Sequence, residues 1–163
     1  MKTNEVKTKR IHNLIIVDES GSMEVIRKQA FVGMNETLQT VRKMQEKFPD
    51  QEQFVTLLTF DSGHTTWHYD NLPAAQTKDL DWKAYCPGGG TPLYDAIGKG
   101  ISKTNAQIED GDHVLVTIIT DGEEKTFYCH ISPLLLQCFV WLLAVVSFPF
   151  TFSDLHIREN SRE

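Results

Sequence analysis

Three short stretches of the chain carry oxygen-bearing side chains that could bind one ligand together. Asp18, Ser20 and Ser22 follow an apolar run in LIIVDESGS. Thr91 follows three glycines in GGGTP, and Asp121 follows the apolar run HVLVTIIT. Each residue offers a carboxylate or hydroxyl oxygen, and none offers sulfur or an imidazole. Such a set suits a hard divalent cation, Mg²⁺ or else Mn²⁺ or Ca²⁺, and suits zinc poorly.

Each of these stretches also has a purely structural interpretation. The serines of DESGS could cap a following helix, and Thr91 before a proline fits a helix start. Asp121 before a glycine could form an ordinary turn. The joint occurrence of all three stretches favours a metal site over three unrelated turns.

The spacing of apolar residues predicts the elements that would position these side chains. The expected strands cover residues 11–17, 53–61, 65–70 and 113–120, and the expected helices cover residues 23–48 and 93–108. Because apolar strands alternate with helices, the order predicts an α/β fold with a doubly wound, mostly parallel, Rossmann-like sheet and helices on both faces. Ligands of such a sheet bind beyond the carboxyl ends of its strands, where the oxygen donors lie.

Taken together, DESGS, GGGTPLYDA and TDGEE resemble the metal-ion-dependent adhesion site (MIDAS) of the von Willebrand factor A (VWA) domain family. The family pattern is Asp-x-Ser-x-Ser, then a separate threonine, then an aspartate after the fourth strand, and every position is filled here. The resemblance implies that the hydroxyls of Ser20, Ser22 and Thr91 bind the metal directly. It implies that Asp18 and Asp121 hold the metal mainly through water.

The resemblance covers residues 11 to 125 and implies a binding module, not an enzyme. Its function would be a Mg²⁺-dependent contact with a protein partner that donates a carboxylate to the metal. The family fold continues past the fourth strand, whereas the family pattern here stops after TDGEEK. The expected domain is therefore incomplete at its C-terminal side.

Catalytic alternatives have weaker support in the sequence. Asp18 could be the phosphorylated nucleophile of a Mg²⁺-dependent phosphatase or phosphotransferase, although a serine-rich loop suits phosphoryl transfer poorly. His64 and His68 have the spacing of an H-x₃-H pair but lack a visible third ligand. The chain contains no G-x-S-x-G elbow and no G-x-x-x-x-G-K-[ST] phosphate loop. No catalytic residue is predicted.

The amino-acid composition limits the classes of partner and the cellular compartment that we expect. The formal net charge of −6 argues against nucleic acid as the main partner. Cys86, Cys129 and Cys138 form neither a CxxC pair nor an even framework, which favours a reducing compartment. We therefore expect a cytoplasmic protein.

The composition changes sharply after residue 126. Residues 127–152 contain no Asp, Glu, Lys or Arg. One interpretation is a single-pass membrane helix that anchors a cytoplasmic binding domain. The other is that the segment results from a frame shift or from an early end of the gene model. We favour the second interpretation. The predicted divisions are a polar tail at 1–10, a partial domain at 11–126, the apolar segment at 127–152 and a polar end at 153–163.

Overall fold

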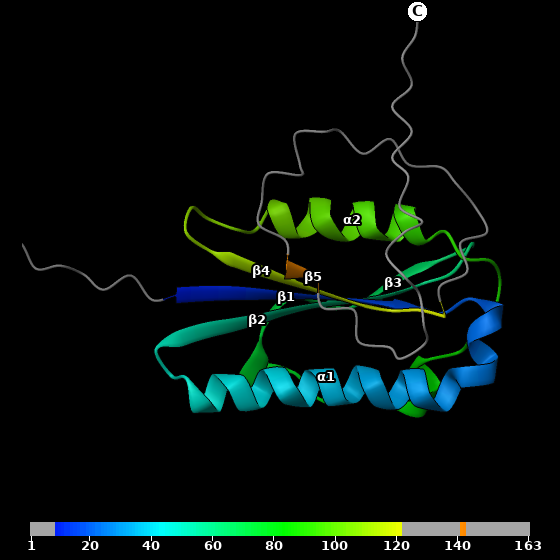
Figure 1. The fold of residues 1–163 in the computed structure, drawn as a ribbon, viewed down its shortest axis with the longest axis horizontal. Helices are drawn as coiled ribbons and strands as arrows, with labels where there is room; N and C mark the ends of the chain where they lie inside the picture. Colours follow the sequence, from blue (N-terminus) through cyan, green and yellow to red (C-terminus); the bar gives the residue numbers. More distant parts are fainter. Residues whose placement is uncertain (1–8, 122–140, 143–163) are drawn as a thin grey trace, which may run out of the picture.

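The computed structural model describes residues 9–121 together with residues 141 and 142 (Figure 1). In chain order the elements are β1 (Lys9–Asp18), the 3₁₀ helix η1 (Gly21–Ile26), α1 (Arg27–Lys47), β2 (Gln51–Phe60), β3 (Thr65–Pro73), the 3₁₀ helices η2 (Ala74–Gln76) and η3 (Trp82–Ala84), α2 (Leu93–Asn105), β4 (His113–Ile119) and β5 (Trp141–Leu142). The predicted strands and helices are thus confirmed in place, with ends that differ by a few residues. The clearest difference is at residues 21–26, which form a 3₁₀ turn before the α-helix begins.

The sheet is small and mixed, with the strand order β3-β2-β1-β4-β5. β1 pairs in parallel with β2 and β4, whereas β3 runs antiparallel to β2. The expectation of a doubly wound, Rossmann-like sheet is therefore wrong. β3 runs antiparallel because the connection between β2 and β3 is short. A few residues can close a hairpin but cannot make the crossover that a parallel pair needs.

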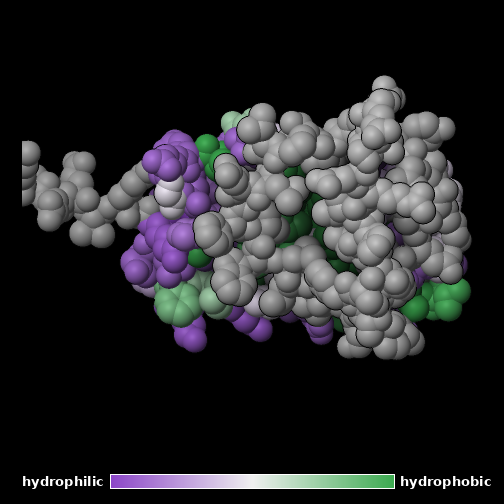
Figure 2. All heavy atoms as spheres, turned by 45° about the horizontal axis from the view of Figure 1, so that its top comes forward, coloured by the Kyte–Doolittle hydropathy of each residue, from purple (hydrophilic) through white to green (hydrophobic). Residues whose placement is uncertain are grey.

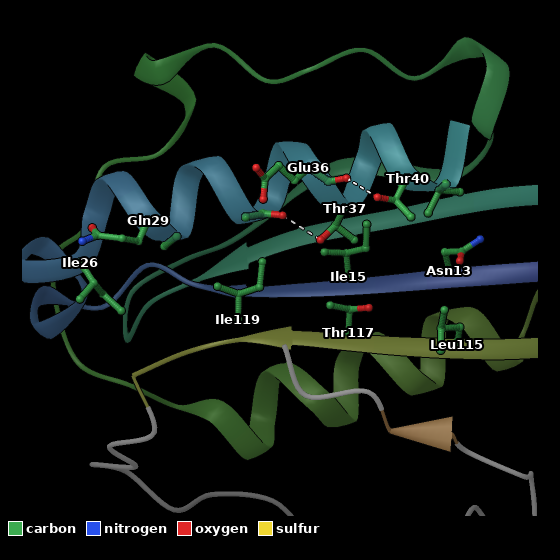
Figure 3. Close-up of a pocket in the computed structure, with 13 residues that line it drawn as sticks. Asn13, Ile15, Ile26, Gln29, Glu36, Thr37, Thr40, Leu115, Thr117 and Ile119 are labelled. Atoms are coloured by element: carbon green, nitrogen blue, oxygen red, sulfur yellow. Dashed lines mark hydrogen bonds between the residues drawn. The ribbon is translucent and has the colours of Figure 1, made fainter. Parts of the chain in front are cut away.

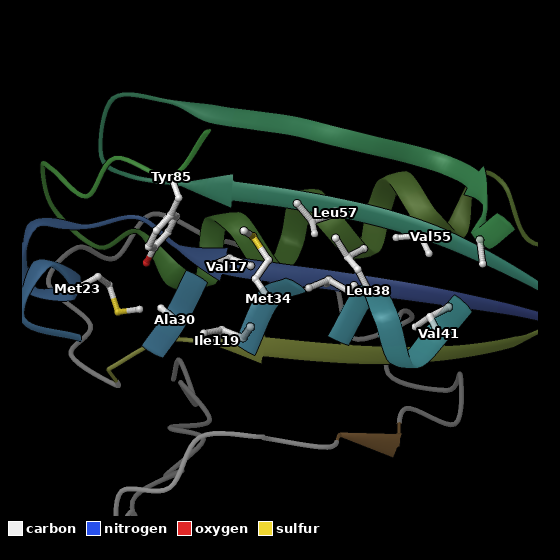
Figure 4. Packing of buried hydrophobic residues seen from close by; sticks show 12 residues of the cluster. Val17, Met23, Ala30, Met34, Leu38, Val41, Val55, Leu57, Tyr85 and Ile119 are labelled. Carbon is white, nitrogen blue, oxygen red and sulfur yellow. The ribbon is translucent and has the colours of Figure 1, made fainter. Parts of the chain in front are cut away.

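The two long helices lie on opposite sides of the sheet, α1 on one face and α2 on the other (Figure 1). β1 supplies buried side chains to both faces, because successive residues of a strand point to opposite sides. Ile15 and Val17 pack in the α1-side cluster, and Leu14 and Ile16 pack in the α2-side cluster. Figure 4 shows the α1-side cluster between α1 and the strands. The central strand is thus buried on both faces, as its continuous apolar sequence predicted.

Helix α2 approaches β1 closely at one glycine. A Cβ atom added at Gly100 would lie 3.2 Å from side-chain carbons of Leu14 and Ile16. A glycine that weakens the helix in isolation therefore allows the helix to pack against the sheet.

The search for membrane-spanning helices covers only the part of the chain that the structure describes. None of the helices within residues 9–121 is long and apolar enough to cross a membrane. Residues 127–152, on which that expectation rested, lie outside the described residues except for Trp141–Leu142, which form the strand β5 beside β4. The expectation of a transmembrane segment therefore stays a prediction.

Candidate functional site

The carboxyl end of β1 delivers the first predicted site residues. Asp18 is fully buried, and its Oδ1 accepts a hydrogen bond of 2.8 Å from the backbone N–H of Ser20. The Oγ atoms of Ser20 and Ser22 lie 3.2 Å apart. The DESGS stretch therefore folds back on itself and gathers a carboxylate and two hydroxyls at one place.

The neighbouring strand contributes Thr120 and Asp121 to the same place. The Thr120 hydroxyl donates a hydrogen bond of 2.8 Å to Oδ2 of Asp18. Burial raises the pKa of Asp18, hydrogen bonds from Ser20 and Thr120 oppose the rise, and the negative charge of Asp121 adds to it. The structure thus brings Asp121 close enough to Asp18 for the two charges to interact. A cation beside these carboxylates would remove their repulsion.

Thr91 is the most informative of the predicted residues. It is 1% exposed, and its Oγ1 has no hydrogen-bond partner among the described residues. A buried hydroxyl without a partner costs roughly 1–3 kcal/mol, so proteins rarely keep one without a reason. A cation that coordinates the lone pair of this oxygen would offset the cost.

The loop that carries Thr91 is joined to the DESGS stretch through backbone hydrogen bonds. The N–H of Gly88 donates to the carbonyl of Glu19 at 2.8 Å, and the N–H of Gly21 donates to the carbonyl of Gly89 at 3.0 Å. These bonds hold the glycine loop against the end of β1. The structure therefore brings the two predicted parts of the site together, although they are far apart in sequence.

The glycine loop depends on the conformation of Gly89. Its φ of +70° lies in the left-handed region, and an added Cβ would lie 2.8 Å from Oγ of Ser62. That hydroxyl also accepts a hydrogen bond of 2.9 Å from the N–H of Gly90. The β2–β3 turn thus supports the loop from its other side, and only glycine fits at position 89.

Asp61 also lies near the glycine loop, but it stabilises a turn. Its Oδ1 accepts hydrogen bonds from the N–H groups of Gly63 and His64 at 2.7 and 2.6 Å. His64 is largely exposed, with Nδ1 3.4 Å from Oδ1 of Asp61. His68 instead has Nε2 3.1 Å from Oγ1 of Thr59, and burial lowers the pKa of His68. The two histidines therefore have different partners.

Sequence reasoning missed several residues that support the site. Thr120 stands beside a predicted ligand and could have been found in the TDGEE stretch. Tyr85, whose hydroxyl donates a hydrogen bond of 2.6 Å to the carbonyl of Asp18, has no local sequence signal. Glu19, whose carboxylate accepts a hydrogen bond from the Cys86 N–H, and Ser62, whose hydroxyl accepts one from the Gly90 N–H, are also missed. Nothing local in the sequence distinguishes them from other polar loop residues.

The donor set fits a hard cation through its hydroxyls as well as its carboxylates. The described parts of the chain contain no group of three or more His, Cys, Asp or Glu side chains that could hold a metal ion. Any cation here would therefore depend on the hydroxyls of Ser20, Ser22 and Thr91 in addition to Asp18 and Asp121. Neutral hydroxyl oxygens are acceptable ligands for Mg²⁺ and Ca²⁺ but poor ones for soft metals.

Two hollows lie on the surface of the described residues. One of about 350 Å³ lies between α1 and β4, and its lining includes Ile15, Ile119 and Thr37 (Figure 3). A smaller polar one of about 140 Å³ lies between the β2–β3 turn and the start of α2, next to Asp61 and Lys99. None of the five predicted site residues lines either hollow. The predicted site residues described above come from three segments at the end of the sheet.

Comparison with known proteins identifies the fold. No protein-family model matches the chain, and no curated protein matches it. Among solved structures, the N-terminal domains of the type V pili tip protein Mfa5 from Porphyromonas gingivalis match with a TM-score of 0.51 and 16% identity, over 68% of this chain and 20% of that chain. The pilus adhesin SpaC from Lactobacillus rhamnosus GG, in its open conformation, matches with a TM-score of 0.55 and 22% identity, over 74% of this chain and 15% of that one.

At these identities the likeness is one of fold alone, and the chain spans a fifth or less of the length of either neighbour. Both neighbours are pilus proteins. The descriptions VWA and MIDAS, which rested on the motifs, receive no support from these comparisons, and the Rossmann-like description is replaced by a small mixed sheet of the kind found in pilus-protein domains.

Proposed function

We propose that the chain is a binding module that holds a divalent cation at the end of its sheet and uses it to contact a protein partner. The cation would be Mg²⁺, or else Mn²⁺ or Ca²⁺. Its ligands would come from the loop cluster formed by Asp18, Ser20, Ser22, Thr91 and Asp121.

One observation carries the proposal, namely the buried Thr91 hydroxyl that has no partner among the described residues. It lies in the loop that is bonded to the DESGS stretch, and that stretch carries a fully buried carboxylate. An unpaired hydroxyl and a desolvated acid are each unfavourable alone. A cation that binds both would compensate both costs, because it accepts oxygen lone pairs and favours the ionised form of an acid.

The chemistry of the donor set suggests how a partner would bind. Hydroxyl ligands carry no charge, and both oxygens of Asp18 already accept hydrogen bonds, from Ser20 and Thr120. The cation would therefore keep much of its positive charge. Mg²⁺ usually retains exchangeable water ligands, so a carboxylate from a partner protein is a suitable additional ligand.

The structural neighbours are consistent with an adhesive role. SpaC is a pilus adhesin and Mfa5 is a pilus tip protein, and neither description is that of an enzyme. We infer that this chain also binds and does not catalyse.

A titration with Mg²⁺ and Mn²⁺ that follows thermal unfolding tests the proposal. We expect the melting temperature of the wild type to rise with the cation, because a ligand that binds only the folded chain stabilises it. The Asp18→Asn variant should lose the rise. Asp81→Asn is the matched control, since Oδ1 of Asp81 accepts a 2.8 Å bond from the N–H two residues later, as Asp18 does.

The Asp81→Asn variant should respond to the cation as the wild type does. A wild-type chain whose melting temperature stays constant up to millimolar Mg²⁺ and Mn²⁺ would refute the cation site. A rise that survives in Asp18→Asn would show that the cation binds elsewhere.

A further inference from the structure

Tyr85 is the largest fully buried side chain in the described part of the molecule. It precedes the glycine loop, and its hydroxyl donates a hydrogen bond of 2.6 Å to the backbone carbonyl of Asp18. Figure 4 shows its ring within the α1-side cluster, beside the carboxyl end of β1. Burial, and then the negative charges around it, raise the pKa of Tyr85, so the hydroxyl keeps its proton and remains a donor.

Arg27, the first residue of α1, holds the backbone of Tyr85. Its Nη2 and Nε donate hydrogen bonds of 2.7 and 3.2 Å to the carbonyl of Tyr85. The guanidinium also lies over the ring of Trp82, with Cζ 4.5 Å from the ring centroid. Arg27 is therefore fixed on two sides, and it fixes Tyr85 in turn.

These contacts connect the two halves of the candidate site. The Asp18 carbonyl belongs to the residue whose carboxylate is at the centre of the site. The glycine loop that follows Tyr85 makes its own backbone bonds to Glu19 and Gly21 before it reaches Thr91. Tyr85 thus provides the one side-chain tether, among the described residues, from this loop to the backbone of Asp18.

We propose that Tyr85 is a positioning residue for the cation site, which sets Asp18 relative to the Thr91 loop, and that Arg27 holds Tyr85 in place. This inference rests on the proposed function. Tyr85 does not contact the cation in this scheme. Its hydroxyl acts through the Asp18 backbone, and the removal of that hydroxyl should loosen the donor set without emptying the core.

The variant Tyr85→Phe removes only the hydroxyl. Tyr69→Phe is its matched control, because the Tyr69 hydroxyl also donates to a backbone carbonyl, that of Lys78 at 2.7 Å, and its ring also packs against the α1-side cluster. Mn²⁺ affinity would be measured by calorimetric titration of the full chain. The melting temperature without metal would be measured for each variant.

We expect Tyr85→Phe to weaken Mn²⁺ binding about tenfold, the size of effect that the loss of one hydrogen bond produces, while Tyr69→Phe binds as the wild type does. Tyr85→Phe should lower the metal-free melting temperature more than Tyr69→Phe does, because the hydrogen bond of Tyr85 is buried and that of Tyr69 is exposed. Unchanged Mn²⁺ affinity in Tyr85→Phe would overturn the inference and leave the proposed function intact. Equal weakening in both variants would also overturn it, because the loss would then not be specific to the tether from Tyr85 to Asp18.

Two variants at Arg27 keep the inference testable if Tyr85→Phe does not fold. Arg27→Met retains an apolar chain over Trp82 but removes every donor, and Arg27→Lys retains one donor group. We expect Mn²⁺ affinity to fall most in Arg27→Met and less in Arg27→Lys. Wild-type affinity in both would overturn the role of Arg27. A wild type that binds no Mn²⁺ would refute the proposed function, and the positioning role with it.

Discussion

His12 and Asp112, separated by 100 residues in the sequence, form a buried pair with Nε2 of His12 3.1 Å from Oδ2 of Asp112. Each side chain is 2% exposed. Nδ1 of His12 lies 2.9 Å from Oδ1 of Asn71 on β3, and Nη1 of Arg10 lies 3.6 Å from the Asp112 carboxylate. This polar cluster joins β1, β3 and the turn before β4. It lies where β1 begins, at the end of the molecule where hydrophilic side chains gather (Figure 2).

The charged cluster predicts an acid-dependent loss of stability. Burial raises the pKa of Asp112, but hydrogen bonds from the Glu109 N–H and His12, with the charge of Arg10, outweigh it and lower the pKa overall. A carboxyl with a lowered folded-state pKa stabilises the fold above its unfolded pKa of about 3.9, and this contribution is lost as the pH falls through the folded-state value. Urea unfolding between pH 6 and pH 3 should therefore show less acid dependence in Asp112→Asn than in the wild type.

The control for this experiment is Asp50→Asn, at an exposed position after α1. It should keep the acid dependence of the wild type. The dependence that remains in Asp112→Asn is expected from Asp70 and Asp79, because hydrogen bonds from Gln107 and Lys103 and from Arg42 and Gln39 lower their pKa values as well. Identical acid dependence in Asp112→Asn and Asp50→Asn would contradict the prediction.

Two buried threonines allow the role of Thr91 to be isolated. The hydroxyls of Thr91 and Thr104 are both buried without a hydrogen-bond partner among the described residues. Valine has nearly the same shape as threonine, so either Thr→Val change should leave stability without metal equal or slightly higher. With saturating Mg²⁺, only Thr91→Val should lose the stabilisation, which for the wild type is about 2.7 kcal/mol at one hundred times Kd. Thermal unfolding with and without Mg²⁺ measures both quantities.

The outcome is decided by the difference between the two valine variants. Thr104 lies on α2 and is not one of the candidate ligands, so Thr104→Val should retain the full response to Mg²⁺. If Thr91→Val were stabilised by Mg²⁺ as strongly as Thr104→Val, the Thr91 hydroxyl would not be a ligand.

Gly89 should not tolerate a side chain. Alanine there would have to adopt φ +70° and would meet the Ser62 hydroxyl at 2.8 Å. The backbone conformation alone costs about 1–2 kcal/mol. Gly111→Ala is the matched control, because its φ is +91° but an added Cβ would have open space. We expect Gly89→Ala to lower the free energy of unfolding more than Gly111→Ala does, as measured by urea unfolding. Adding Ser62→Ala should not reduce the loss to zero, since the backbone strain remains.

Two helical glycines should respond in opposite directions to alanine. An added Cβ at Gly33 on α1 would have nothing within 4 Å, whereas one at Gly100 on α2 would press on Leu14 and Ile16. Gly33→Ala should therefore stabilise the chain by about 0.5–1 kcal/mol through helix propensity. Gly100→Ala should destabilise it, because a well-packed core tolerates added volume poorly. Urea unfolding measures the free energy of unfolding of both variants. A higher value for Gly100→Ala than for Gly33→Ala would contradict this prediction.

Much of the fold could be predicted from apolar patterning. The continuous run at residues 14–17 identified a strand buried on both faces, and the helices were found from their period. The sheet type was predicted wrongly because pattern alone does not distinguish a hairpin partner from a crossover partner. The loop length between Phe60 and Thr65 held the missing information.

The candidate site was only partly predictable for a related reason. The spacing within DESGS is local, so the proximity of Asp18, Ser20 and Ser22 follows from the sequence. The contacts of Tyr85 and Arg27 are long-range and depend on how η3 and the glycine loop return to the end of β1. The spacing of apolar residues carries no information about these long-range contacts.

The central strand separates two polar regions that share no residue. Both regions contact β1, and the six residue steps from His12 to Asp18 span roughly 20 Å at about 3.3 Å per residue. His12 lies near one end and Asp18 at the other, with fully buried aliphatic side chains between them. Changes at such a distance usually have additive free energies. Asp112→Asn and Asp18→Asn should therefore change the free energy of unfolding additively, so the acid tolerance of the fold can change independently of the candidate cation site.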